Sequence, residues 1–403
     1  MCNMRGKISE NYNYTIYACY GGYVVQAIIN NLAPLLFLTF QREFGISLER
    51  IGLLITVNFG VQMLTDMAAA RYADRIGYRA CVLAAHACSA AGLICMGTLP
   101  FVMDNAYAGL VIAMILGAVG GGLIEVLISP IVEAAPSSNA KDAAMSLLHS
   151  FYCWGHVAVV LLSTAGFRIL GMDRWYLLPI LWSIVPIGNF LMFTRVPIRM
   201  LVEESGRTPA VQLLKSGIFW VFIGLMICAG ASEQGMSQWA SMFAEEGLGV
   251  SKTLGDLLGP CLFAVLMGSS RAFYGKFGEK MNLQKFMLGS GVLCIISYLL
   301  AVLMRDPLLA LAGCGLCGLS VGIMWPGTFS LAVKRCPGGG TLMFACFALA
   351  GDVGCASGPG LVSFVSEHLP EYGLKAGLAA AILFPVILIV LLAASTRRNR
   401  DTN

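Results

Sequence analysis

The feature that most constrains this chain is a succession of twelve apolar runs separated by short polar turns. Each run is close to the roughly 20 residues that an α-helix needs to cross about 30 Å of hydrocarbon. Only 12% of the residues are charged, whereas soluble domains carry about a quarter. The sequence therefore predicts an all-α integral membrane protein with twelve transmembrane helices. The runs lie at about 15–40, 50–70, 80–101, 106–132, 143–167, 175–194, 217–243, 254–274, 286–304, 307–333, 341–365 and 374–395.

Several functional classes are excluded by what the sequence lacks. It has no G-x-x-x-x-G-K-[ST] run to hold ATP phosphates, no H-E-x-x-H pair and no G-x-S-x-G nucleophile motif. We therefore predict neither an ATP-driven pump nor an enzyme, with no catalytic residues and no cofactor. Cys314 and Cys317 form a C-x-x-C inside an apolar run without His or carboxylate neighbours, which indicates packing residues and not a metal site. The formal charge of +4 comes from loops, so no nucleic-acid partner is expected.

The distribution of Lys and Arg predicts the orientation of the spans. With the N-terminus placed in the cytoplasm, 19 of the 26 basic residues fall in inner segments and 7 in outer ones. Under the positive-inside rule this predicts cytoplasmic termini and an even number of spans. The first run has no cleavage site of small residues after a short core, so it is predicted to be a retained span.

The chain also contains an internal duplication. Its longest polar stretch, 197–216, separates a predicted bundle at 1–196 from a second at 217–403. The segment 67–71 begins with Met and ends with Arg71, and the similar segment 267–271 ends with Arg271, at an offset of 200. Gly45 and Gly249 precede similar turns at an offset of 204. Such repeats are typical of transporters whose two halves rock around a central site.

The loop after the second run resembles a motif of the major facilitator superfamily. It reads Arg71-Tyr72-Ala73-Asp74-Arg75-Ile76-Gly77-Tyr78-Arg79, with Ala70 where Gly is usual and Tyr78 where Arg is usual. The resemblance implies a fold of two pseudosymmetric six-helix bundles. In physical terms the loop charges can bond to helix ends and hold an inner gate closed; the alternative is a basic turn that only sets topology. The predicted gating residues are Asp74, Arg75, Arg79, Arg71 and Arg271.

Within that superfamily the chain is most similar to the fucose-permease type of sugar transporter. The similarity lies in Asn30-Asn31, in Glu125 followed by Ser129-Pro130, and in His149-Ser150-Phe151 and Pro326-Gly327. Members carry a carboxylate in the fourth span, matched here by Glu125. They also carry an Asp shortly after the Asn-Asn pair, where this sequence has Pro34. One half of the family's usual proton-handling pair is therefore absent.

Polar residues inside the apolar runs are the candidate site. Carboxylates in mid-bilayer are costly and tend to mark function, while amides can bond to solute hydroxyls and an indole can stack on a sugar. A purely structural helix–helix role is the alternative for Glu125 and for Asp352, and Asp66 is expected to belong with the loop charges. The predicted substrate-binding residues are Gln26, Asn30, Asn31, His149, Glu233, Gln234 and Trp239, and the predicted coupling residues are Glu125, Asp352 and His156.

These observations predict a secondary active transporter that moves a sugar or sugar-like solute by alternating access, coupled to a cation such as H⁺. The alternative is proton-driven export of amphipathic compounds, which the 20 methionines would suit; a non-transporting sensor on the same fold is a third possibility. The expected partners are the solute, the coupling ion and the lipid bilayer. We expect a monomer in a bacterial inner (plasma) membrane.

Overall fold

A computed structural model of the chain describes residues 8–134, 141–199, 214–277, 281–336 and 340–400. Within these ranges the chain is helical and has no β-strand. Among the described residues, eleven helices are long and apolar enough to cross a membrane, and the segment Leu177–Phe193 is a shorter apolar helix. The predicted twelve-helix membrane fold is confirmed, with the predicted sixth span as its shortest member. The chain is a multi-pass membrane protein.

The helices group into two compact units. The first comprises Met1–Leu36 and Val61–Glu203, and the second comprises Phe37–Gly60 and Glu204–Asn403. The predicted bundles had placed all of the first two spans in the first half, whereas Phe37–Gly60 groups with the second unit. The residues of the predicted linker between 200 and 213 lie outside the described residues.

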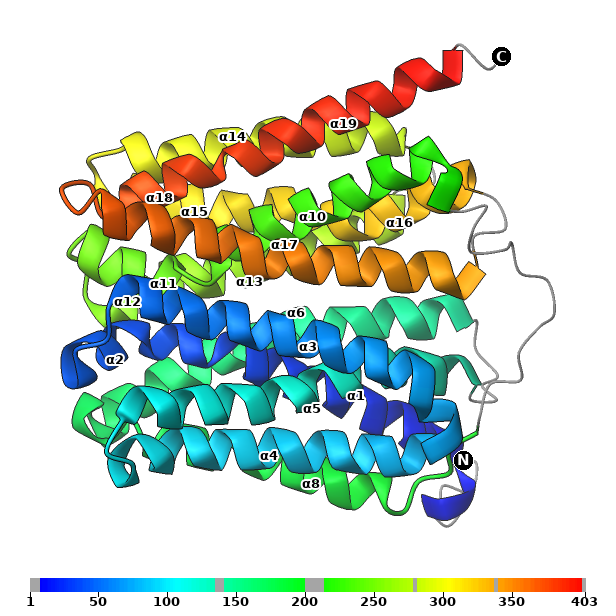
Figure 1. The fold of residues 1–403 in the computed structure, drawn as a ribbon, viewed down its shortest axis with the longest axis horizontal. Helices are drawn as coiled ribbons and strands as arrows, with labels where there is room; N and C mark the ends of the chain where they lie inside the picture. The colour runs from blue at the N-terminus through cyan, green and yellow to red at the C-terminus, as the bar shows by residue number, and fades with distance from the viewer. Residues whose placement is uncertain (1–7, 135–140, 200–213, 278–280, 337–339, 401–403) are drawn as a thin grey trace. The chain divides into compact units, whose positions relative to one another are not determined.

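The first unit is built on long helices with apolar sides facing one another. In its interior α4 lies along α5 (Figure 1). Residues of α1, α4 and α5 such as Val25, Val82 and Ile128 are completely buried there. Its elements are α1 (Tyr12–Asn31), η2 (Ala33–Leu36), the part of α3 (Leu48–Ile76) from Val61 onward, α4 (Tyr78–Val102), α5 (Ala106–Ala134), α6 (Lys141–Leu170), η3 (Met172–Arg174), α7 (Leu177–Trp182) and α8 (Ile184–Phe193), preceded by η1 (Ile8–Glu10).

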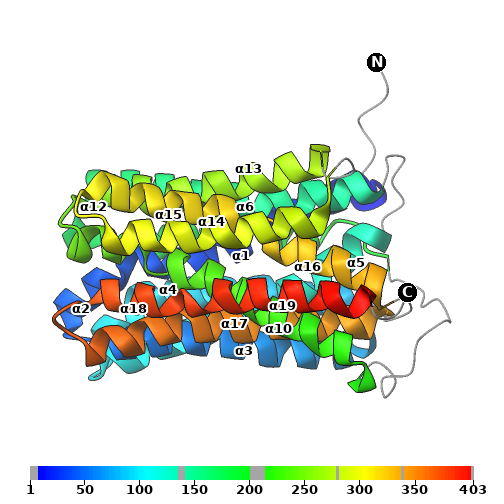
Figure 2. The same ribbon diagram turned by 90° about the horizontal axis from the view of Figure 1, so that it is seen from above.

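The second unit has the same kind of construction, with α14 lying along α15 (Figures 1 and 2). Large side chains such as Phe222, Phe263 and Phe347 fill its core. Its elements are α2 (Phe37–Phe44), the start of α3, α10 (Gly217–Ser237), α11 (Ala240–Met242), the π-helix η4 (Phe243–Gly247), α12 (Lys252–Asp256), the π-helix η5 (Leu257–Cys261), α13 (Leu262–Phe277), α14 (Leu283–Leu303), α15 (Pro307–Val321), α16 (Met324–Arg335), α17 (Gly340–His368), α18 (Leu374–Ala381) and α19 (Leu383–Arg400).

The first span of each half is interrupted near its polar residues. In the first half α1 ends at Asn31 and a 3-10 turn at Ala33–Leu36 follows. Pro34 explains the break, because its ring lacks an N–H and crowds the carbonyl four residues earlier. In the second half α10 ends at Ser237 and the span continues through α11 and η4. Irregular backbone at membrane depth is tolerated where protein or an aqueous cavity covers it.

The duplicated turns adopt the same backbone conformation. Gly45 has φ +64° and Gly249 has φ +66°, the left-handed region that glycine enters without a steric penalty. Each glycine follows the end of a first span and precedes the helix that starts the next one. The two segments that resemble each other in sequence therefore also share a backbone conformation at this glycine.

Small residues bring the start of α3 against α17 inside the second unit. A Cβ atom on Gly52 would lie only 1.9 Å from the Ser363 Oγ, and one on Gly360 would lie 3.5 Å from the Thr56 Oγ1. Close approach through small residues is a common way for membrane helices to pack. These contacts explain why Phe37–Gly60 groups with the second unit.

Candidate functional site

The amides of α1 connect three other helices of the first unit. The Gln26 Nε2 donates to the Glu125 Oε2 of α5 at 2.6 Å. The Asn30 Oδ1 accepts from the Gln62 Nε2 of α3 at 2.8 Å. The Asn31 Nδ2 donates to the Ala27 carbonyl at 2.9 Å and to the Tyr152 hydroxyl of α6 at 3.3 Å. The structure thus brings the predicted residues Gln26, Asn30, Asn31 and Glu125 into one polar layer.

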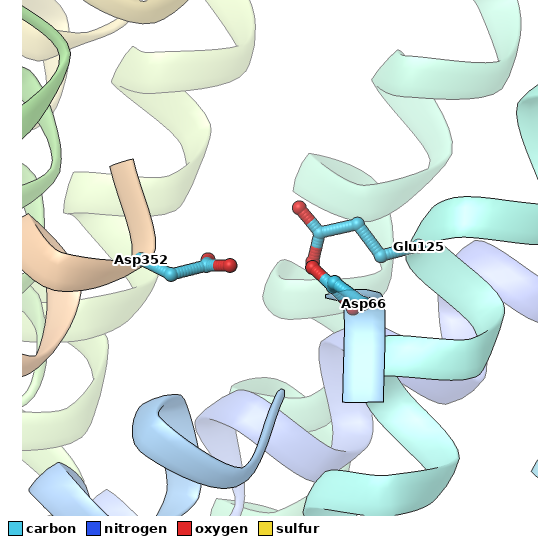
Figure 3. A group of neighbouring side chains, drawn as sticks. All are labelled: Asp66, Glu125 and Asp352. Atoms are coloured by element: carbon cyan, nitrogen blue, oxygen red, sulfur yellow. The ribbon is translucent and has the colours of Figure 1, made fainter. Parts of the chain in front are cut away.

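A second carboxylate lies next to Glu125. A carboxylate oxygen of Asp66 on α3 lies within 4.8 Å of one of Glu125 on α5, and Figure 3 shows the two side chains meeting. Asp66 is only 5% exposed, so the expectation that it belongs with the loop charges is wrong. We call Asp66 and Glu125 the acid pair.

A glycine permits the close approach of the acid pair. Gly122 lies one turn before Glu125 on α5, so it shares that residue's face. A Cβ atom there would lie 2.8 Å from the Asp66 Oδ1 and 2.9 Å from the Gln62 carbonyl. The absence of a side chain at this position lets α3 and its carboxylate lie against α5.

The two histidines predicted from α6 occupy different environments. His149 is exposed, and its ring lies 5.3 Å from the ring of Tyr23 on α1. Tyr23 in turn shares a hydrogen bond of 3.1 Å with the Ser129 hydroxyl. His156, two turns farther along α6, is only 2% exposed. His149 therefore lies beside the first span, where its role in substrate binding stays a prediction, while His156 lies in the interior of the first unit.

In the second unit the predicted Glu233 and Gln234 belong to a chain of oriented side chains. The Gln238 Nε2 donates to the Gln234 Oε1 at 2.8 Å, and the Gln234 Nε2 donates to the Glu233 Oε1 at 3.2 Å. The other oxygen, Glu233 Oε2, lies 3.6 Å from the Arg271 Nη2 on α13. Arg271, predicted as a gating residue, thus lies beside a carboxylate predicted to bind substrate.

Trp239 lies between α10 and α11 and is completely buried. Its indole Nε1 donates to the Pro359 carbonyl at 3.2 Å. Its ring lies 5.6 Å from the Phe37 ring of α2, which belongs to the same unit. In this conformation Trp239 packs against protein; a role in stacking on a solute stays a prediction.

Asp352, the third predicted coupling residue, lies on α17 and is 3% exposed. The preceding Gly351 faces Trp325 of α16, whose ring a Cβ atom would meet at 2.0 Å. Asp352 is therefore a buried carboxylate within the second unit.

The predicted inner-gate loop has one firmly bonded arginine. Arg79 donates from Nη1 to the Phe193 carbonyl at 2.6 Å and from Nη2 to the Val196 carbonyl at 2.7 Å. The Phe193 carbonyl lies at the C-terminal end of α8, where a cation is favourable, and the Val196 carbonyl lies just beyond it. Arg71 is exposed, 5.8 Å from the Tyr72 ring, and Arg75 is exposed as well. The side chain of Asp74 lies outside the described residues.

Sequence reasoning missed two groups of residues. Gln62 and Asp66 follow Asn58 at intervals of four, which places all three on one face of α3. All three side chains are buried: Asn58 is 3% exposed, Gln62 is 1% exposed and Asp66 is 5% exposed. This spacing inside an apolar run was the signal available in the sequence.

The second missed group lies where the seventh span meets the eighth. The Lys252 Nζ lies 3.2 Å from the Glu245 Oε1 and 3.2 Å from the Asp256 Oδ2. The Ser241 hydroxyl donates to the Asp256 Oδ1 at 2.5 Å. Asp256 is completely buried. We call these four residues the Lys252 cluster.

Comparison with known proteins points to a single family. The family model described as Major Facilitator Superfamily matches residues 19–359. No curated protein matches the sequence.

Several solved structures share the fold at 14% sequence identity. A bacterial homologue of the human lysosomal transporter Spinster, in an inward-facing and occupied conformation, has a TM-score of 0.76, with 96% of this chain and 97% of that chain covered. A D-xylose–proton symporter has a TM-score of 0.74, with 94% and 96% covered. The fucose:proton symporter of E. coli has a TM-score of 0.65, with 95% and 98% covered.

Proposed function

Because the chain belongs to the Major Facilitator Superfamily and is therefore a membrane transporter and not an enzyme, we propose that it is a secondary active transporter of a small polar solute. The solute is a sugar or a sugar-like molecule, moved by alternating access and coupled to protons. The chain lies in a bacterial inner membrane as a monomer, with both termini in the cytoplasm.

The acid pair is the observation that carries the proposal. Two carboxylates within 4.8 Å of one another repel when both are ionised and are stabilised when one proton lies between them. A conformational change that separates or exposes the pair would release that proton. The Gln26 amide bonded to Glu125 links the protonation of the acid pair to α1, the span that carries the predicted solute-binding amides.

The acid pair also accounts for the departure from the fucose-permease pattern. This sequence has Pro34 where that type has a first-span carboxylate, and Asp66 on α3 supplies a second carboxylate beside Glu125 from another helix. The residue that was missing from the first span is replaced in the second.

Polar groups around the broken first spans support a hydroxylated solute. Gln26, Asn30, Asn31 and Gln234 are amides, each of which offers both donors and acceptors. A site built from such groups discriminates by the hydroxyls that it bonds. Proton-coupled transport of fucose and of xylose by proteins of the same fold is consistent with this substrate class.

The test is transport by the purified protein in proteoliposomes with an imposed pH gradient. L-fucose, D-xylose, D-galactose and D-glucose are supplied as labelled solutes. Glu125→Gln is expected to abolish accumulation driven by the gradient while counterflow exchange continues, because exchange needs no net proton movement. Glu49→Gln, an exposed acid at the start of α3, is the matched control. Driven accumulation that survives Glu125→Gln would exclude the acid pair as the coupling site, and export of amphipathic compounds alone would exclude the sugar.

A further inference from the structure

We propose that Glu233 and Arg271 together recognise two adjacent hydroxyl groups of an uncharged sugar, so that Arg271 determines specificity and is not a gate residue. The proposal rests on the proposed function and names the part of the solute that the second unit binds.

The first observation is that both side chains of this pair are partly exposed within membrane-spanning segments. The side chain of Glu233 is 10% exposed and that of Arg271 is 22% exposed. A carboxylate and a guanidinium at membrane depth face the protein interior or a water-filled cavity, and tend to lie on a solute pathway. The pair is therefore placed where a solute can touch it.

The second observation is that each partner is also held by other groups of the second unit. Gln238 and Gln234 form a chain that ends on the Glu233 Oε1, so the Oε2 is the oxygen turned toward Arg271. The Arg271 Nε donates to the Gly322 carbonyl at 3.3 Å, and its Nη2 contacts the Met267 sulfur at 3.7 Å. Both head groups are thus positioned before a solute arrives, which reduces the cost of binding.

The third observation is the separation of the two head groups. Nη2 and Oε2 lie 3.6 Å apart, whereas a charge-assisted hydrogen bond is about 2.7–2.9 Å long. The pair is close enough for its charges to neutralise each other but is not joined by a short direct bond. A hydroxyl can approach both atoms without first breaking such a bond.

The chemistry of the pair selects the solute. A carboxylate only accepts hydrogen bonds and a guanidinium only donates them, whereas a hydroxyl does both. Two neighbouring hydroxyls on a sugar ring match this arrangement, one donating to the Glu233 Oε2 and the other accepting from Arg271. A solute with its own charge would compete with one partner and leave the other charge unpaired in a buried place, which is unfavourable. The expected solute is therefore a neutral sugar, and not a sugar acid or an amino sugar.

The test is equilibrium binding by the full-length protein in lipid nanodiscs. L-fucose, D-xylose, D-galactose and D-glucose are measured first. The tightest of them is then compared with its deoxy analogues, one hydroxyl removed at a time, and with its uronic acid and amino sugar. We expect two deoxy analogues with adjacent missing hydroxyls to bind about 10- to 100-fold more weakly, because each leaves a buried polar group unsatisfied. The charged analogues are expected to bind at least as weakly.

Variants then assign each hydroxyl to its partner. In Arg271→Gln one of these two analogues should bind as well as the parent sugar, and in Glu233→Gln the other should. Arg271→Lys keeps the charge beside Glu233 and serves as the folded variant if Arg271→Gln is unstable. Because lysine lacks the guanidinium fork, the logarithm of the affinity ratio between the parent sugar and its deoxy analogues should fall by at least half. Arg335→Gln, which removes an arginine bonded to the Ser395 carbonyl, should leave the ratios unchanged.

A uniform loss of affinity for the parent sugar and every deoxy analogue in the Arg271 and Glu233 variants would overturn the inference, because it indicates a structural ion pair. So would equal or tighter binding of the charged analogues. In both cases sugar binding itself would still support the proposed function. Absence of binding and of accumulation for every sugar tested would instead overturn the proposed function, and this inference with it.

Discussion

The polar interiors of the two units differ in how their acids are compensated. In the first unit the acid pair is surrounded by amides, with Gln26 bonded to Glu125. In the second unit Glu233 lies beside Arg271, and Glu245 and Asp256 lie beside Lys252. Acids that share a region with one another are suited to holding a proton, whereas acids matched by bases are suited to solute contacts or to structure. This contrast underlies our proposals that the first unit handles the ion and that the charged pair of the second unit discriminates between solutes.

The difference arises inside a duplicated framework. At an offset of 200 positions, Gln62 and Asp66 correspond to Leu262 and Leu266, so the polar face of α3 has no counterpart in the second half. The same offset pairs Arg71 with Arg271. Arg71 is exposed, whereas Arg271 lies beside Glu233.

A local change in helix geometry accompanies this difference. The π-helical turn η5 (Leu257–Cys261), which contains Pro260, precedes α13 in the second half, whereas α3 is α-helical throughout. One extra residue in a helical turn rotates every later side chain relative to the helix axis. The two arginines at equivalent positions therefore follow helical segments of different local geometry.

The largest expected effect comes from removing one member of the acid pair. Asp66→Asn should reduce proton-driven accumulation in proteoliposomes by about tenfold or more, because the proton can no longer be shared between two carboxylates. A tenfold change corresponds to about 1.4 kcal/mol. Counterflow exchange should persist. Asp104→Asn, which alters an exposed acid between α4 and α5, is the matched control. Unchanged accumulation in Asp66→Asn would mean that Glu125 works alone and would remove half of the contrast between the units.

The next effect is on folding and concerns the second unit. Lys252→Met should lower the free energy of unfolding in detergent by about 3–5 kcal/mol, because it leaves the buried Asp256 without its cation. Lys252→Met combined with Asp256→Asn should recover most of that loss. If the single substitution is as stable as the wild type, the acids of the second unit do not depend on their bases, and the contrast in compensation loses its physical basis.

A smaller effect is expected from Gly122→Ala. The new methyl group would lie 2.8 Å from the Asp66 Oδ1, so Asp66 must move away from α5, at about 1–3 kcal/mol for overpacking. Driven accumulation should fall severalfold although both carboxylates remain. Gly121→Ala is the matched control, since the new methyl group would lie 3.4 Å from the Gln62 side-chain amide, an ordinary contact distance. Equal activity of the two variants would show that coupling does not depend on the separation of the acid pair.

The sequence predicts the fold better than it predicts the site. Apolar length and the distribution of basic residues are properties of each run alone, so twelve spans follow from them. Gln26 and Glu125 stand out for the same reason, as polar residues in apolar runs. Their contact with each other depends on how α1 packs on α5, which no single run encodes.

Asp66 illustrates the limit most clearly. Near the end of an apolar run and five residues before Arg71, it reads as one of the loop charges. Its burial beside Glu125 depends on Gly122 of another helix. Arg271 is a similar case. Its position, 200 residues after Arg71, pairs it with an exposed arginine, and the π-helical turn that precedes α13 is not visible as a sequence pattern.

The smallest effect separates the two equivalent arginines. Arg71→Gln should change the free energy of unfolding by no more than about 0.5 kcal/mol, since Arg71 is exposed and lies over the Tyr72 ring of its own helix. It should also leave sugar affinity unchanged, whereas Arg271→Gln should alter the ratio between sugars and their deoxy analogues. Thermal unfolding and equilibrium binding, measured on both variants in the same nanodiscs, make the comparison direct. A loss of affinity in Arg71→Gln equal to that in Arg271→Gln would indicate that both arginines act through the gate, and the division of roles between the two units would then be wrong.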